Sequence, residues 1–236
     1  MRYRYLLLLS VALILSCTSS QRKEQKHEFT AEPIPAIQTE VVSPKFCDIT
    51  QSGQKNTVLA LEKESNAPYS RKYFMNLNKG RSWGDLDHDC QDTRAEVLTE
   101  RSLIPVVMSK NRCAVRLGLW HDPYTDSLFE DASDLDIDHI IPLKEAYESG
   151  AIKWDDKQRG LFANDYQISK NLIPVWNSSN RSKGAKDLAE WLPSDENYHC
   201  EYVLRWIGIK SHWKLSVDEK ECLVIQKLVQ QCDMDN

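Results

Sequence analysis

The stretches DLDIDHIIPL (Asp134–Leu143) and NLIPVWNSSNRSKG (Asn171–Gly184) decide the fold of this chain. In the first, apolar residues alternate with aspartates, which predicts a half-buried strand carrying Asp136 and Asp138 on one face. His139 follows directly and would point to the opposite face of a regular strand. Asp138 and His139 can therefore share a site only if the strand ends or bulges at this point.

The second stretch opens with Asn171 and the apolar run LIPVW, which predicts another strand. Ser178 or Ser179 can cap a helix that begins near Asn180. The stretch contains no acidic residue in a chain whose net charge is −5, so it forms a local basic patch. The cations in and around it are Lys170, Arg181, Lys183 and Lys186.

These residue types suit one kind of chemistry. A carboxylate and an amide oxygen can share a hard divalent cation. A histidine beside them can take a proton from water. Cations near the N-terminus of a helix favour a bound phosphate. The two stretches together therefore indicate a site for hydrolysis of a phosphodiester.

The N-terminus is typical of an exported protein. Residues 1–16 combine a positive start with an apolar run too short to span a bilayer, which predicts a signal peptide. The run ends in ILSC, which resembles the lipobox of bacterial lipoproteins, so Cys17 is a candidate for lipidation and membrane anchoring. An ordinary cleaved signal with an incidental Cys17 is the alternative. Residues 17–55 are expected to form a flexible tether, and residues 56–236 one folded domain.

The cysteine count agrees with export. Of seven cysteines, one is Cys17, and an even number remains for disulfides in an oxidising compartment. The sequence does not determine the connectivity. We expect Cys90 to pair with Cys113 and Cys200 with Cys232, which leaves Cys47 with Cys222 by elimination. A zinc site is less favoured because no CxxC pair is present.

An acidic loop offers a second possible metal site. Asp85, Asp87 and Asp89 alternate, and Glu96 lies at the twelfth position, as in a calcium-binding EF-hand loop. The sixth position is cysteine where that loop requires glycine. The simpler interpretation is that Asp92 caps a helix through residues 95–100. Arg94 is then a candidate phosphate contact, or alternatively a partner for the nearby acidic residues.

Several further elements are expected. TVLALEKE (57–64) predicts a short helix, and IPVVMS (104–109) and CAVRLGLW (113–120) predict strands followed by a turn at HDPYTD (121–126). The C-terminal third is predicted to be helical. Its last helix is expected to start with a capping box of Ser216 and Glu219.

The order of DH, Asn171, Asn180 and a basic helix start resembles the HNH nucleases of the ββα-metal fold. The segments WGDLDHDCQDTRAEVL, DPYT, DLDIDHIIPL, FAND and NRSKG resemble a branch of small exported bacterial HNH proteins. That branch is related to the C-terminal nuclease domain of GmrSD restriction enzymes. The resemblance implies an α+β fold with a ββα-metal core embedded in a mostly helical, disulfide-stapled single domain.

The resemblance also assigns roles. His139 matches the general base, and Asp138 and Asn180 match the metal ligands, for which Mg²⁺ is expected and Mn²⁺ is possible. Asn171 matches the asparagine that braces the loop and orients the base. Further from the metal, Asp136 would support the ligands, and Arg181 and Lys183 would contact phosphate.

The implied function is a metal-dependent endonuclease outside the cytoplasm, acting on nucleic acid, with DNA favoured and little sequence preference. The alternative is a non-catalytic binding lipoprotein that binds calcium through the Asp85–Glu96 loop. A nuclease used as a toxin against rivals would have the same chemistry.

Overall fold

The computed structural model describes residues 46–50, 57–78, 80–81 and 83–234. All of them belong to one compact unit, Val42–Asn236. The predicted signal peptide, Cys17 and most of the predicted tether lie outside the described residues. No helix in the described part of the chain is long and apolar enough to cross a membrane.

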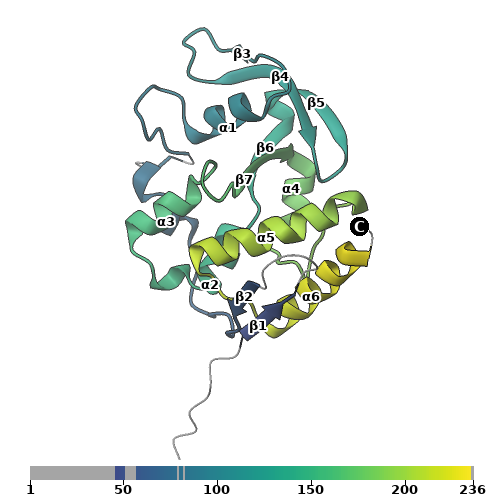
Figure 1. Cartoon of the computed structure of the whole chain (residues 1–236). Coiled ribbons are helices and arrows are strands. Elements are labelled where there is room, and N and C mark those ends of the chain that lie inside the picture. The colour runs from purple at the N-terminus through teal and green to yellow at the C-terminus, as the bar shows by residue number, and fades with distance from the viewer. Residues whose placement is uncertain (1–45, 51–56, 79, 82, 235–236) are drawn as a thin grey trace, which may run out of the picture. The chain divides into compact units, whose positions relative to one another are not determined.

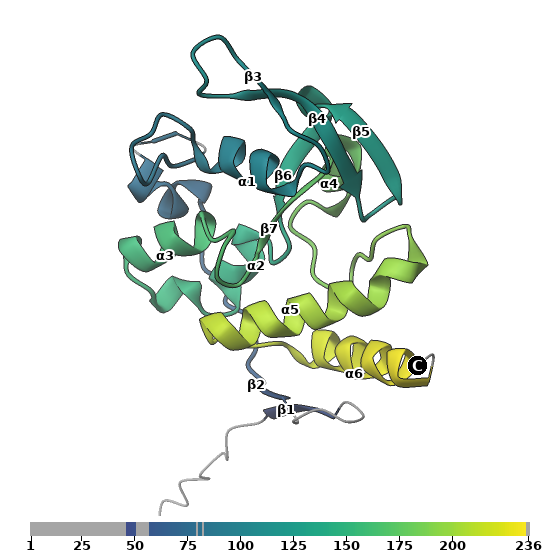
Figure 2. The same ribbon diagram turned by 45° about the horizontal axis from the view of Figure 1, so that its top comes forward.

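The strands form three small antiparallel sheets. The β1–β2 pair and the three-stranded sheet β3–β4–β5 lie at opposite ends of the described unit, with the β6–β7 pair between them (Figures 1 and 2). The strands are β1 (Phe46–Ile49), β2 (Thr57–Ala60), β3 (Val107–Met108), β4 (Val115–Asp122), β5 (Ser127–Asp131), β6 (Leu135–His139) and β7 (Leu172–Trp176).

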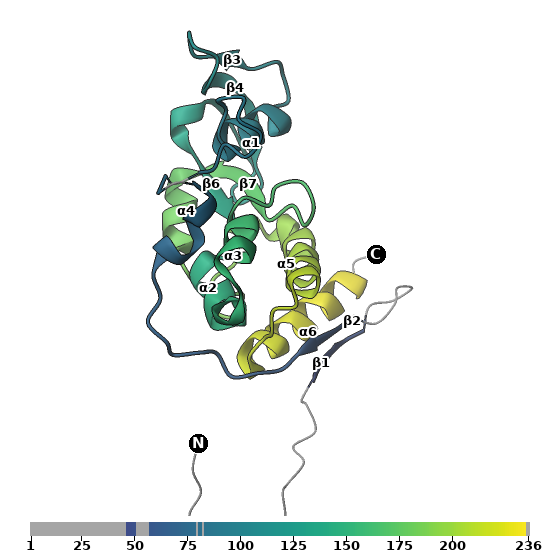
Figure 3. The same cartoon turned by 90° about the vertical axis from the view of Figure 1, so that its left-hand side faces the viewer.

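Six α-helices and several short 3₁₀ turns complete the described residues, and the predicted α+β class is confirmed. Helices α5 and α6 run side by side, and the β1–β2 pair lies against them (Figure 3). The helices are α1 (Thr93–Arg101), α2 (Leu143–Glu148), α3 (Asp156–Ala163), α4 (Asn177–Lys183), α5 (His199–Trp213) and α6 (Glu219–Met234). The 3₁₀ turns are η1 (Arg71–Phe74), η2 (Asn76–Asn78), η3 (Ala132–Asp134), η4 (Ala151–Lys153) and η5 (Glu196–Tyr198).

The helix predicted over residues 57–64 is wrong, because Thr57–Ala60 is strand β2. Its backbone pairs with β1 in register from Phe46 opposite Ala60 to Ile49 opposite Thr57. The fold thus includes Phe46–Ile49, ahead of the start expected near residue 56. Tertiary pairing outweighs the weak helical preference of this short segment, as is common for strands.

Two predicted helix caps also differ from the structure. Helix α4 begins at Asn177, directly after β7, and no side chain caps it. Helix α6 is capped by Asp218, whose Oδ1 accepts from the Glu221 N–H at 2.8 Å. Ser216 instead donates its hydroxyl to the Ser149 carbonyl. The predicted cap of α1 is confirmed, since Asp92 accepts from the Ala95 N–H at 3.0 Å.

The β6–β7 pair lies between two hydrophobic cores. Leu135 and Ile137 of β6 belong to a smaller core with α1 and Trp120 of β4. Ile173 and Val175 of β7 belong to the larger core, which includes α5 and α6. Burial on both sides fixes the register of the pair, because a one-residue slip would turn apolar side chains toward the wrong face.

Three disulfides join Cys47 to Cys222, Cys90 to Cys113 and Cys200 to Cys232, and all three expected pairings are confirmed. They tie β1 to α6, the acidic loop to the β3–β4 turn, and α5 to α6.

A buried ion cluster joins three helices of the larger core. The Lys210 ammonium on α5 donates to Glu145 on α2 at 2.6 Å and to Glu221 on α6 at 2.7 Å. All three side chains are almost fully buried. Removal of one partner would leave an uncompensated buried charge, so the cluster fixes how these helices pack.

Candidate active site

Two antiparallel strands and one helix bring the predicted site residues together. Asp138 of β6 lies opposite Ile173 of β7, and His139 opposite Leu172. Helix α4 follows β7 without a loop and packs against both strands. The strand ends at His139, as the sharing of one site by Asp138 and His139 requires.

A cavity of about 350 Å³ lies over this arrangement. Its lining includes Asp138 and His139 at the end of β6 and Asn180 from α4. Arg71 and Lys144 line it as well. The structure therefore places the predicted base and both predicted metal ligands around one space, although Asn180 and His139 are far apart in the sequence.

His139 is held in one orientation and one tautomer. Its Nε2 lies 2.9 Å from the Ala163 carbonyl oxygen, which can only accept, so Nε2 carries the proton and Nδ1 is the basic nitrogen. The ring is stacked between Trp83, at 5.4 Å, and Phe162, at 6.4 Å between ring centroids. Burial, and then the nearby positive charge of Arg71, lower the pKa of His139 to about 3. The imidazole is therefore neutral, as a general base must be.

Asp138 is one half of a buried ion pair. Its Oδ2 accepts from the Lys183 ammonium at 2.7 Å and from the Tyr124 hydroxyl at 2.6 Å. Burial raises the pKa of Asp138 and lowers that of Lys183, while their mutual attraction opposes both changes. The other oxygen, Oδ1, makes no hydrogen bond with a described residue, which leaves it available as a ligand.

Lys183 was predicted to contact phosphate, and the structure contradicts this. Its side chain is fully buried, and its ammonium also donates to the His139 carbonyl at 2.6 Å. Asn180 and Lys183 lie three residues apart on α4, and both side chains reach β6. Lys183 thus holds the end of β6 in place and cannot reach a substrate.

Asn180 is oriented by Asp136. Its Nδ2 donates to Asp136 Oδ2 at 3.1 Å, which leaves the amide oxygen Oδ1 as the free ligand atom. Asp138 Oδ1 and Asn180 Oδ1 would offer a metal ion oxygen ligands only. Such a set fits a hard divalent cation such as Mg²⁺ or Mn²⁺ better than Zn²⁺.

Asn171 is hydrogen-bonded to the turn that follows His139. Its Oδ1 accepts from the Ile141 N–H at 2.9 Å, and its carbonyl accepts from the Ile140 N–H at 2.8 Å. The side chain is fully buried and touches the turn that follows His139. This geometry is that of a brace for the turn, as the resemblance implied.

The other predicted phosphate contacts lie outside the cavity lining. Arg94 is directed at the backbone, because its Nη2 donates to the Ala132 and Leu135 carbonyls at 2.7 and 2.9 Å. It therefore anchors the start of β6, and its predicted contact with phosphate is untested. Arg181 is exposed on α4 but does not line the cavity. Its role as a phosphate contact stays a prediction.

The sequence did not single out Trp83, Tyr124, Phe162 or Arg71. Trp83 and Phe162 sit within motif segments, but nothing in their spacing marks contact with His139. Tyr124 belongs to DPYT, a segment predicted only as a turn, yet its hydroxyl is buried against Asp138. Only the three-dimensional arrangement reveals these contacts.

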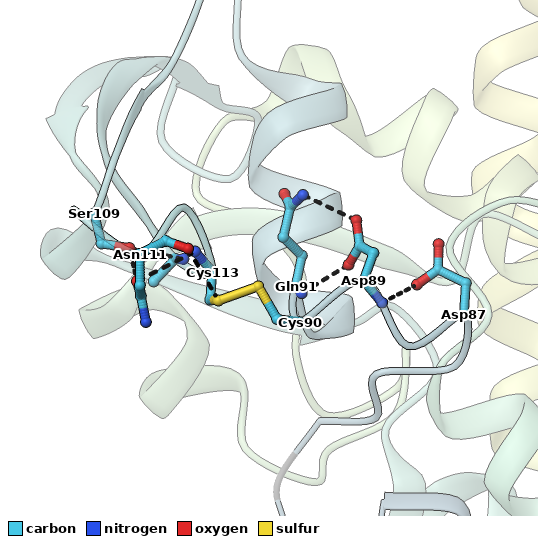
Figure 4. Close-up of a disulfide and its surroundings, with 8 residues drawn as sticks. Asp87, Asp89, Cys90, Gln91, Ser109, Asn111 and Cys113 are labelled. Carbon is cyan, nitrogen blue, oxygen red and sulfur yellow. Dashed lines mark hydrogen bonds between the residues drawn. A yellow bond between two sulfur atoms is a disulfide. The ribbon is translucent and has the colours of Figure 1, made fainter.

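The acidic loop lies apart from this cavity. Carboxylate oxygens of Asp85, Asp87 and Asp89 gather within 4.8 Å of one another. The loop's own backbone uses some of them, because the Gln91 N–H donates to Asp89 Oδ1 at 2.7 Å (Figure 4). Cys90 has a left-handed φ of 81° and is bonded to Cys113. Calcium binding here stays a prediction from the sequence.

Comparison with known proteins gives two matches. The sequence profile of the C-terminal domain of GmrSD restriction endonucleases matches residues 89–227. An uncharacterized secreted protein of the fungus Arthroderma benhamiae is 38% identical over 164 residues, which cover 70% of this chain and 76% of that protein. No solved structure matches. The motifs resemble bacterial proteins while this relative is fungal, so a bacterial source stays a prediction.

Proposed function

Because this chain belongs to the family of the C-terminal domain of GmrSD restriction endonucleases, we propose that it is a metal-dependent endonuclease of the HNH type. It hydrolyses phosphodiester bonds of nucleic acid, with DNA favoured, outside the cytoplasm. The observation that carries the proposal is the position of His139, which is held by the Ala163 carbonyl and shares one cavity with Asp138 and Asn180.

His139 acts as the general base. Its Nδ1 takes a proton from water, and the oxygen of that water attacks phosphorus while the 3′ oxygen leaves. The Ala163 carbonyl keeps the proton on Nε2 throughout, and the flanking Trp83 and Phe162 rings prevent the imidazole from turning. A fixed base lowers the entropic cost of reaching the reactive geometry.

Asp138 and Asn180 would hold one divalent cation, Mg²⁺ or Mn²⁺, through the two oxygens that protein hydrogen bonds leave free. When bound, the ion would neutralise charge on the scissile phosphate and on the departing oxygen. Asp136 and Lys183 position these ligands, the first through the Asn180 amide and the second through Asp138.

The expected partner is nucleic acid bound through its phosphates, with little sequence preference. Export is supported by the secreted relative and by three disulfides, which persist in oxidising compartments. Anchoring through a lipidated Cys17 is proposed on the lipobox resemblance alone.

Plasmid cleavage by the purified oxidised protein tests the function. We expect cleavage with Mg²⁺ or Mn²⁺ and none in EDTA. The His139→Ala variant should lose about 10²–10⁴-fold in rate, the usual contribution of a general base. His121→Ala is the matched control, because His121 is exposed and pairs with Asp126 outside the cavity lining.

Two outcomes would contradict the proposal. Equal cleavage by the His139 and His121 variants would remove His139 as the base. A folded wild-type protein that cuts neither DNA nor RNA with any of these metals would favour the binding lipoprotein instead.

A further inference from the structure

A phosphodiester at this site would be bound by cationic side chains as well as by the proposed metal ion, and two of the predicted phosphate contacts do not line the cavity. Lys183 is buried against Asp138, and Arg94 is bonded to backbone carbonyls. Arg71 is the cation that lies in the right place.

Arg71 lines the same cavity as His139 and is exposed. Its guanidinium makes no hydrogen bond or ion pair with a described residue. The other cation of the lining, Lys144, is paired with Glu148 one turn along α2. Among the described residues that line this cavity, Arg71 is therefore a cation without an ion pair.

The backbone that carries Arg71 is firmly held. Ser70 caps the short 3₁₀ turn Arg71–Phe74, and the Phe74 ring is fully buried between Tyr147 and Phe162. Arg159 of α3 donates from Nε to the Tyr73 carbonyl at 3.2 Å. The fixed backbone means that only the Arg71 side chain, and not the turn that carries it, has to be ordered when a ligand binds.

We propose that Arg71 is a substrate-binding residue that holds the non-bridging oxygens of the phosphodiester beside His139. The inference rests on the proposed function and adds a residue from a segment that precedes the matched residues 89–227. A guanidinium offers two parallel N–H groups to a phosphate, which fixes the orientation of the phosphate as well as its position. Substrate binding would then depend on residues 69–74 as well as on the strands and helix that carry the base.

The test compares Arg71→Ala with Lys72→Ala in the full oxidised protein. Lys72 is the next residue, is exposed and does not line the cavity, so both variants lose one charge from the same turn. Binding of a fluorescent DNA duplex is measured by anisotropy with Mg²⁺ at several salt concentrations, in the His139→Ala background so that the DNA stays intact. Cleavage kinetics are measured with His139 present.

We expect Arg71→Ala to raise the Kd about tenfold or more, as for loss of a hydrogen-bonded charge. The slope of log Kd against log salt concentration should fall by about one unit, which is the contribution of one phosphate contact. Lys72→Ala should change the Kd by less than about twofold. Arg71→Lys keeps the charge but not the paired N–H groups, so it should retain the salt slope and recover only part of the affinity.

Equal Kd, salt slope and kcat/KM for the Arg71→Ala and Lys72→Ala variants would overturn the role of Arg71. If wild type still cut DNA and His139→Ala did not, the proposed function would stand. A wild-type protein that neither binds nor cuts nucleic acid would overturn both.

Discussion

Replacement of Lys183 by methionine tests whether this lysine is structural, as its burial implies. Methionine fills a similar volume but leaves the Asp138 carboxylate without its ion pair and the His139 carbonyl without its donor. The side chains of Lys183 and Asp138 are 0% and 6% exposed, so water cannot replace the lost contacts. Breaking a buried pair in this way costs about 3–5 kcal/mol.

We therefore expect Lys183→Met to lower the free energy of unfolding by about 4 kcal/mol. For a domain of this size that corresponds to a fall in Tm of about 8–16 °C. Guanidinium denaturation followed by tryptophan fluorescence measures the first quantity, and calorimetry the second. Lys186→Met is the matched control, because the Lys186 ammonium is exposed and, among the described residues, donates only to the Ser182 carbonyl. It should stay within about 0.5 kcal/mol of wild type.

A double-mutant cycle sharpens the test. Asp138→Asn keeps an acceptor for the Tyr124 hydroxyl and removes the negative charge. When Asp138→Asn is combined with Lys183→Met, neither charge remains buried. The double variant should therefore lose clearly less unfolding free energy than the sum of the losses in the two single variants. Two results would refute the reasoning. The first is a Lys183→Met variant as stable as the Lys186 control but defective in DNA binding. The second is strict additivity in the cycle.

Two further predictions concern stability. Burial and a neighbouring carboxylate raise the pKa of Glu64 to about 9 from its usual value of 4.5, so its folded state favours the protonated form. The stabilising contribution of Glu64 is complete below about pH 4.5 and is lost as the pH rises towards 9. Glu64→Gln should therefore reduce the loss of unfolding free energy between pH 5, 7 and 9, measured by denaturation at each pH. The same pH dependence in the variant and the wild type would contradict this. Replacing Cys47 and Cys222 by serine opens a loop of 175 residues, for which the chain-entropy relation gives at most about 5 kcal/mol. The same relation gives about 3 kcal/mol for the 23-residue loop of Cys90 and Cys113. Urea denaturation should therefore show a larger loss of unfolding free energy for the Cys47 and Cys222 variant than for the Cys90 and Cys113 variant.

The parts of the site that follow from local sequence were predictable. Alternating apolar residues and aspartates identified β6, and its end at His139 followed from the need for Asp138 and His139 to share a site. Asp136 was expected to lie behind the metal ligands, and the structure shows it accepting a hydrogen bond from the Asn180 amide. In each case the residues lie on elements whose period can be read from the chain.

The parts that depend on tertiary packing were not predictable. Lys183 looked like an exposed cation because its neighbours in NRSKG are polar, but α4 begins three residues earlier than expected and directs Lys183 toward β6. Arg71 carries no periodic signal, and the Tyr147 and Phe162 rings that hold Phe74 of its turn come from distant segments. The Thr57–Ala60 strand depends likewise on a partner outside its own window.

The Cys47–Cys222 link has a consequence for biosynthesis. Cys222 follows every residue of the candidate site in the chain, so this crosslink can close only after the whole site sequence has been made. Because the N-terminus is made first, the Cys47 thiol stays without its native partner at a stage when Cys90 and Cys113 can already form their disulfide. Wrong early pairings of Cys47 would have to be reshuffled, a process that takes seconds to hours. Maturation of the protein should thus be limited by thiol exchange and should depend on a disulfide isomerase in the producing cell.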